Sequence, residues 1–298
     1  MSIFQGIVLG VLQGIAEFLP ISSSGHLIVA QNLFGLEEVP LLFDVFLHVA
    51  TLLAVVLYFR KKIWELICSF ARIFVPIKNP SAAQIEKKSE DTKYIVAIIL
   101  ATFVTGVLGV FSSKVISEIS VKAVCAGFVV TALLLIFFFF FYKIYSAFSV
   151  SSFKSLSWKQ SLAIGFAQGI GTLPGISRSG STIAGALFCG VKRDVAGEFS
   201  FIVSIPAILG AFILELKDLG EVSSSIGAEP VIAGCAAAFA SGYIALSWLM
   251  RLIKKGRLEW FACYLIPVGI LGMIFAIPFS AFIVCAWDRI SNRWLAKD

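Results

Sequence analysis

The chain has 298 residues, of which 59% are hydrophobic and only 14% are charged, and its mean hydropathy is +0.95. A soluble domain has about 25% charged residues, so this composition excludes an ordinary soluble fold and indicates a membrane protein. The net charge is +6. The basic residues lie mostly between apolar stretches, so membrane topology explains this charge and no nucleic-acid partner is predicted.

Six apolar stretches are long enough to cross a bilayer, which takes roughly 20 residues. They lie near residues 41–59, 94–111, 121–142, 197–216, 229–252 and 260–287. Two further apolar segments, 3–34 and 161–190, are interrupted at their centres by Pro and Ser-Gly, which favours pairs of half-helices that fold back. We expect an all-α polytopic membrane protein with six transmembrane helices and two re-entrant helical hairpins. The polar stretch 78–93 is predicted to be a mobile loop.

The two interrupted segments are copies of each other. The sequence GVLQGIAEFLPISSSGH at 10–26 returns as GFAQGIGTLPGISRSGS at 165–181, with identities at a constant spacing. Broken backbone is tolerated inside a membrane only where protein buries it or where it lines a wet cavity. The repeat therefore predicts a site within one membrane domain (1–298), whose repeat halves are about 1–142 and 161–287.

The distribution of basic residues predicts the orientation of the chain. If each hairpin returns to its own side, 17 of the 24 Lys and Arg residues fall on one side of the membrane. By the positive-inside rule that side is cytoplasmic, and both termini are outside. The hairpins then enter from opposite sides, and such inverted-topology repeats place a shared site near the midplane.

The second copy contains an anion-binding pattern, LPGISRSGST at 173–182. Pro174 and Gly175 break the helix, and the start of the next half-helix offers unpaired amides to an anion. Arg178 adds a planar, permanently charged donor suited to phosphate. The expected phosphate contacts are Ser177, Ser179, Gly180 and Thr182. The alternative is that the hydroxyls cap the half-helix and that Arg178 pairs with Glu17 only to hold the hairpins together.

The first copy carries groups suited to proton transfer. Gln13 and Glu17 lie four residues apart, on one face of the first half-helix. His26 follows Ser23 closely, and a His near a hydroxyl can activate a nucleophile or protonate a leaving group. The expected phosphate contacts of this copy are Ser22, Ser24 and Gly25.

Three residues outside the hairpins are expected to support the site together with Gln13. Asp44 and His48 lie four residues apart on the span after the first hairpin, and Glu198 corresponds to Asp44 after a one-residue slip of the repeat. For His48, a packed polar partner is an equally good interpretation.

These motifs resemble the bacterial undecaprenyl pyrophosphate phosphatase family, also known for bacitracin resistance. The family's signatures stand here as Gln13 to Glu17, Pro20 to His26 and Pro174 to Thr182, and the resemblance covers essentially the whole chain. It implies hydrolysis of the C55 prenyl diphosphate to the monophosphate carrier of cell-wall glycans. It also implies a location in the bacterial plasma (inner) membrane, with the active site facing outside.

The resemblance further implies that Glu17, Ser23, His26 and Arg178 are catalytic, with either the serine or a water as nucleophile. A divalent cation, Mg²⁺ or Ca²⁺, is expected near Glu17 and Gln13. Bacitracin would compete for the prenyl diphosphate, and a homodimer is expected as a possible assembly. The rival hypothesis is a transporter or translocase of the lipid carrier, because inverted repeats with broken helices are a transporter architecture.

Overall fold

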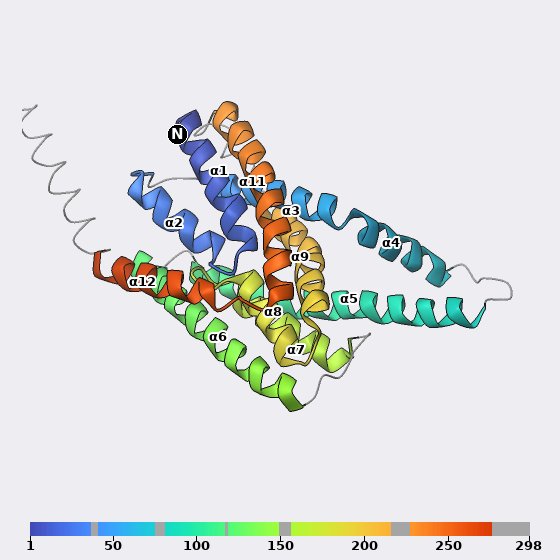
Figure 1. Cartoon of the computed structure of the whole chain (residues 1–298). Coiled ribbons are helices and arrows are strands. Elements are labelled where there is room, and N and C mark those ends of the chain that lie inside the picture. The colour runs from blue at the N-terminus through green and yellow to red at the C-terminus, as the bar shows by residue number, and fades with distance from the viewer. Residues whose placement is uncertain (37–40, 75–80, 117–118, 149–155, 216–226, 276–298) are drawn as a thin grey trace, which may run out of the picture.

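The structure is a computed structural model that describes residues 1–36, 41–74, 81–116, 119–148, 156–215 and 227–275. Within these ranges the chain forms eleven helices and no strand. The first hairpin consists of α1 (Ile3–Phe18) and α2 (Ser23–Leu33), and the second consists of α7 (Trp158–Ile170) and α8 (Arg178–Phe188). The other helices are α3 (Leu41–Tyr58), α4 (Arg60–Phe74), α5 (Ala82–Ile116), α6 (Val121–Phe148), α9 (Arg193–Glu215), α11 (Ala228–Lys255) and α12 (Trp260–Phe275) (Figure 1).

The helices confirm an all-α protein with several apolar spans. Four of them, α5, α6, α9 and α11, are long and apolar enough to cross a membrane. A fifth candidate is the pair α3 and α4, bent by 81° at a short break. The described part of α12 is apolar but has only 16 residues, and the predicted stretch to 287 continues outside the described residues.

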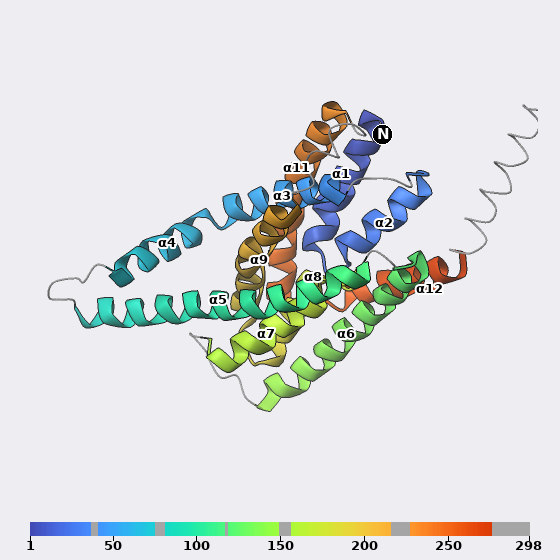
Figure 2. The same cartoon turned by 180° about the vertical axis from the view of Figure 1, so that it is seen from behind.

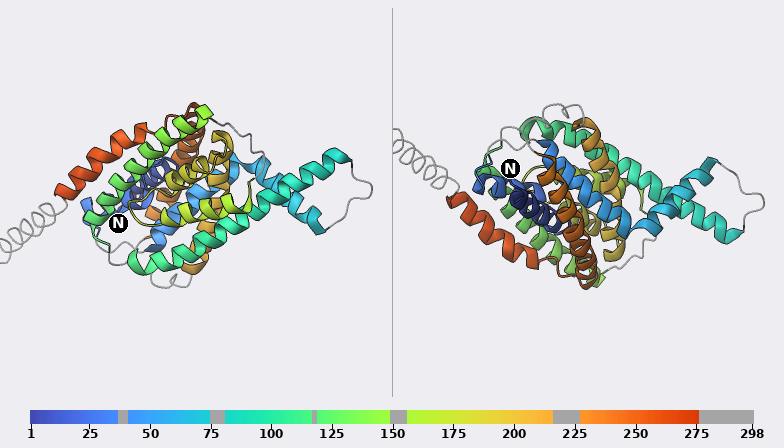
Figure 3. Two further views of the ribbon diagram at one scale, coloured as in Figure 1. Left: turned by 90° about the horizontal axis from the view of Figure 1, so that it is seen from below. Right: turned by 90° about the horizontal axis from the view of Figure 1, so that it is seen from above.

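The predicted loop at 78–93 is wrong for most of its length, because α5 begins at Ala82. A capping box at the preceding residue explains the start: Ser81 and Gln84 exchange side-chain and backbone hydrogen bonds. The polar turns of α5 pack on α4, where Ser69 Oγ donates to Asp91 Oδ2 at 2.5 Å. These two helices form an arm that projects from the bundle (Figures 1 and 3).

The sequence repeat extends to the starts of both hairpins. Ser2 and Gln5 form a capping box before α1, and Ser157 and Gln160 form the same box before α7. Each box satisfies backbone donors that the first turn of a helix leaves unpaired. Both hairpins therefore begin in the same way, at equivalent positions.

Several of the main helix contacts recur when the two halves are exchanged. Helix α1 packs on α11 and α7 packs on α5, while α3 packs on α11 and α9 packs on α5. The helices α3 and α9 contact each other, and so do α6 and α12. Figure 2 shows α5 crossing α7, as α11 crosses α1 in Figure 1.

The repeated glycines make these crossings possible. A Cβ on Gly10 would overlap the carbonyl oxygen of Gly234 in α11, and a Cβ on the equivalent Gly165 would lie 2.6 Å from the carbonyl oxygen of Ala101 in α5. The repeated glycines Gly10 and Gly165 are therefore explained by close helix packing and not by the site.

Replacing Gly10 with Ala is expected to lower stability by about 1–3 kcal/mol, because the methyl group forces α1 away from α11. Thermal melting of the detergent-solubilised protein measures the effect. Gly106→Ala is the matched control, since a Cβ there meets nothing within 4 Å. Equal melting temperatures for wild type and Gly10→Ala would contradict the tight crossing.

Candidate functional site

The breaks of the two hairpins pack against each other. Ser179 Oγ in α8 lies 3.4 Å from the carbonyl oxygen of Leu19. A Cβ on Gly25 would lie 3.1 Å from Cα of Gly175, and a Cβ on Gly180 would lie 3.0 Å from Pro20 Cβ. Small residues at these positions therefore let the two broken segments meet. The starts of α2 and α8 are brought to one place.

Helix α6 fixes the second break. The hydroxyl of Thr131 donates to the carbonyl of Gly175 and accepts from the backbone N–H of Ser177, both at 3.0 Å. Gly175 has φ +87°, a conformation that glycine adopts without strain. The break is thus held by a residue far away in the sequence.

Glu17 is the centre of the polar cluster, and it is 5% exposed. Its Oε1 pairs with Arg178 Nη2 at 2.5 Å, an ion pair between the two hairpins. Its Oε2 accepts from Ser23 Oγ at 2.6 Å and from Gln13 Nε2 at 3.0 Å. The predicted neighbours Gln13, Glu17, Ser23 and Arg178 are therefore in direct contact.

The other terminal nitrogen of the arginine, Arg178 Nη1, is buried and has no hydrogen-bond partner among the described residues. The side chain as a whole is 15% exposed. A guanidinium that donates to a carboxylate through one nitrogen still has N–H groups that can donate to a second acceptor. The ion pair therefore does not exhaust the donors of Arg178.

The two copies differ at the starts of their second half-helices. Ser177 caps α8 by accepting from the backbone N–H of Gly180 at 3.1 Å. The equivalent Ser22 has φ +71° and makes no side-chain cap for α2, and its buried hydroxyl has no partner. The first-turn amides of α2 thus lack the cap that α8 has, and uncapped amides attract anions.

Three of the residues expected to contact phosphate have hydroxyls that are engaged within the protein in this structure. Ser177, Ser179 and Thr182 are at most 1% exposed. Their hydroxyls bond within the protein, that of Thr182 to the carbonyl of Arg178 at 2.6 Å. Ser177 is thus the helix cap that the alternative expects, whereas Ser179 and Thr182 cap nothing. Gly180 serves the close contact with Pro20 and gives its amide to Ser177.

His26 does not pair with the hydroxyl of Ser23, which donates to Glu17 instead. Its Nδ1 lies 2.8 Å from the carbonyl oxygen of Ser22, so Nδ1 carries the hydrogen. Its Nε2 lies 2.9 Å from the hydroxyl of Tyr264, and the two rings stack. Since Nδ1 donates, Nε2 of the neutral ring accepts from Tyr264.

Tyr264 is the site residue that the sequence motifs do not reveal. It lies on α12, separated from His26 by most of the chain, and it is 45% exposed. A lone aromatic residue in an apolar helix carries no local signal of such a contact. Only the packing of α12 beside the first hairpin brings it to the site.

Of the three supporting residues, the structure brings two to the cluster. His48 donates from Nδ1 to the carbonyl of Asp44, which leaves its Nε2 3.4 Å from Glu17 Oε2. The Asp44 carboxylate accepts from Gln31 at 2.8 Å. Among the described residues, Glu198 forms no hydrogen bond or ion pair with this cluster. Its carboxylate instead accepts from the hydroxyl of Tyr94, on α5, at 3.4 Å.

The donor set does not fit a resident divalent cation. Among the described residues, no three His, Cys, Asp or Glu side chains gather to hold a metal. Glu17 already accepts from an arginine, a serine and an amide, and the unpartnered buried oxygens of the first hairpin's described residues are Gln13 Oε1 and Ser22 Oγ. Mg²⁺ and Ca²⁺ require several oxygen ligands, and these neutral oxygens with one engaged carboxylate are a poor set for them.

Comparison with known proteins gives a consistent assignment. The family model described as bacitracin resistance protein BacA matches residues 6–271. A protein of Treponema denticola named undecaprenyl-diphosphatase is 45% identical, over 91% of this chain and 96% of its own length. Proteins of the same name from Desulfatibacillum aliphaticivorans and Methanobrevibacter smithii are 39% and 40% identical, over 95% and 96% of their lengths. The chain therefore belongs to the bacitracin resistance protein BacA family.

Proposed function

We propose that this protein is a membrane hydrolase that removes one phosphate from undecaprenyl diphosphate and returns the monophosphate carrier to cell-wall glycan synthesis. The relatives' shared name supports this substrate. The observation that carries the reaction type is the 2.6 Å hydrogen bond from Ser23 Oγ to Glu17 Oε2, made next to Arg178. A hydroxyl that donates to a carboxylate beside a phosphate-binding arginine is suited to phosphoryl transfer.

The phosphate would bind between the two hairpins. Arg178 Nη1 and the uncapped first turn of α2, with Ser24 and Gly25, supply donors for the phosphate oxygens. The free hydroxyl of Ser22 adds another. His48, whose Nε2 lies 3.4 Å from Glu17 Oε2, helps to position this carboxylate.

Ser23 is the nucleophile in this mechanism. As its Oγ forms a bond to the terminal phosphorus, Glu17 takes the hydroxyl proton and the bond from phosphorus to the bridging oxygen breaks. Prenyl monophosphate leaves with the electron pair of that bond. Glu17 passes its proton to the departing prenyl phosphate oxygen. It then takes a proton from a water, whose oxygen bonds to the phosphorus of the phosphoserine as the bond to Ser23 Oγ breaks. Oγ leaves with that electron pair and regains the proton from Glu17, so that inorganic phosphate is released and one water is consumed per turnover.

His26 acts beside this centre and not as the base of Ser23. A chain of hydrogen bonds from Tyr264 through His26 to the carbonyl of Ser22 supports the positive φ of Ser22 and connects the site to a residue that is 45% exposed. Its role is to orient the uncapped start of α2 and to exchange protons with solvent.

The remaining partners follow from the substrate. A divalent cation, Mg²⁺ or Ca²⁺, would arrive bound to the diphosphate oxygens, and no step above depends on it. Bacitracin would compete for the same lipid, and a homodimer stays a prediction. The translocase hypothesis is not favoured, because carriage of the lipid requires neither a nucleophile nor a proton acceptor.

We also propose the inverted arrangement, with six spans and two re-entrant hairpins in the plasma membrane and the site open to the outside. The helix contacts that recur in the two halves support this inverted arrangement. An alkaline-phosphatase fusion after Lys88 should be inactive and one at the C-terminus active, since this reporter folds only outside the cytoplasm. The opposite pattern would contradict the orientation.

Ser23→Ala is expected to reduce phosphate release by at least on the order of a thousandfold, because no other hydroxyl donates to Glu17 in the described residues. Binding of prenyl diphosphate should persist, since Arg178 and the α2 amides remain. Ser204→Ala is the control: its hydroxyl only bonds to the backbone of its own helix. Near-normal turnover by Ser23→Ala would assign the attack to water and overturn the serine mechanism.

Tyr264→Phe is expected to lower turnover up to about tenfold, the effect of one lost hydrogen bond of about 1 kcal/mol. The ring and its stacking on His26 stay in place, so stability should change little. Steady-state kinetics and melting of the same preparation separate the two effects. Tyr243→Phe, which alters a tyrosine packed on Tyr58, is the matched control. If Tyr264→Phe lowers the melting temperature but leaves turnover unchanged, Tyr264 has a packing role only.

A further inference from the structure

The turn between α11 and α12 carries a groove that plays no part in the proposed reaction. It has a volume of about 580 Å³. Its lining residues are Trp248, Leu252, Lys255, Arg257, Trp260 and Phe261. Helices α11 and α12 are both apolar, so the turn that joins them lies where two membrane-embedded helices end.

The aromatic residues of the groove are those of a membrane interface. Trp248 is 50% exposed and Trp260 is 63% exposed. Tryptophan is enriched at the headgroup level of bilayers, where its ring is partly in apolar and partly in polar surroundings. The groove therefore opens at the depth of the lipid headgroups.

The charges of the groove are positive. Lys255 and Arg257 are both exposed, and the Arg257 guanidinium lies 5.3 Å from the ring centre of Trp260. Among the described residues, those that line the groove include no acidic side chain, although Glu259 belongs to the same turn and is partly buried. Basic residues at the membrane surface attract anionic lipids.

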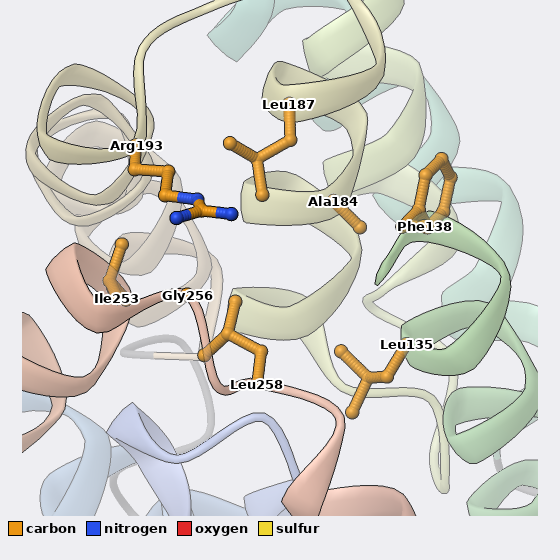
Figure 4. Close-up of a pocket in the computed structure, with 8 residues that line it drawn as sticks. All are labelled: Leu135, Phe138, Ala184, Leu187, Arg193, Ile253, Gly256 and Leu258. Carbon is orange, nitrogen blue, oxygen red and sulfur yellow. The ribbon is translucent and has the colours of Figure 1, made fainter. Parts of the chain in front are cut away.

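The inner side of the same turn is closed by packing. Gly256 has φ +65°, and a Cβ there would lie 2.6 Å from Arg193 Nη2. Figure 4 shows the Arg193 guanidinium directed toward this turn, among apolar side chains that include Leu187 and Leu258. The turn is thus tightly fixed, and it presents Lys255 and Arg257 on its outer side without further ordering.

We infer that this groove binds the headgroup of an anionic phospholipid of the surrounding bilayer. The lipid phosphate lies between Lys255 and Arg257, the two tryptophans flank the glycerol region, and the acyl chains follow the apolar surface. The inference is independent of the hydrolytic reaction.

Tryptophan quenching by brominated lipids tests it with the full chain in nanodiscs. Phosphatidylcholine nanodiscs receive a small fraction of brominated phosphatidylglycerol or of brominated phosphatidylcholine. The fluorescence of Trp248 and Trp260 is obtained by subtracting the fluorescence of the Trp248→Phe/Trp260→Phe protein from that of the wild type. We expect phosphatidylglycerol to be enriched at these residues by about tenfold, and Lys255→Gln/Arg257→Gln to abolish the preference.

The matched control is Arg251→Gln/Lys254→Gln, which removes the same charge from exposed residues of α11 outside the groove and should keep the preference. High salt should weaken the preference of the wild type, a test that needs no variant. Three results would each overturn the inference. They are equal quenching by both lipids, an equal loss of the lipid preference in both charge variants, and a preference that does not change with salt. Phosphate release by each variant shows that it is folded.

Discussion

The ion pair between Glu17 and Arg178 is the interaction on which the site depends. It joins two hairpins that are far apart in the sequence and lies within a bundle of apolar helices. A buried carboxylate without its cation costs several kcal/mol, so neither residue is tolerated there alone. The pair therefore ties the two hairpins together through Glu17 Oε1, while Oε2 of the same carboxylate accepts from Ser23.

A symmetric scaffold carries this asymmetric centre. Both halves have a capping box before the first half-helix and a glycine where this helix crosses its neighbour. Several helix contacts of one half also recur in the other. At the breaks the copies differ, because Arg178 stands where the first copy has Ser23, and because Ser177 caps its helix whereas Ser22 does not. The second copy thus provides a cation on a capped, rigid support. The first provides the proposed nucleophile, Ser23, and the uncapped amides of α2.

The sequence predicts those parts of the structure that depend on local pattern. The interruptions in two apolar segments predict the two hairpins. Charged residues within apolar segments are unusual, and this predicts that Glu17 and Arg178 belong to the site. The roles of Thr131 and Tyr264 were not predictable, because each acts through a contact between remote segments. The Ser177 hydroxyl was assigned to phosphate because a capping serine and a ligand serine have the same local sequence. The start of α5 was missed because its polarity reflects exposure on the arm, although its capping box is visible in the sequence.

A double-mutant cycle on phosphate release tests the central claim most directly. Glu17→Gln, Arg178→Gln and the double variant are compared with wild type on a long-chain prenyl diphosphate. If the pair acts as one unit, each single variant loses most activity and the double variant is little worse than either. If the losses of the single variants multiply in the double variant, the two residues act independently, and the ion pair is not the basis of the site.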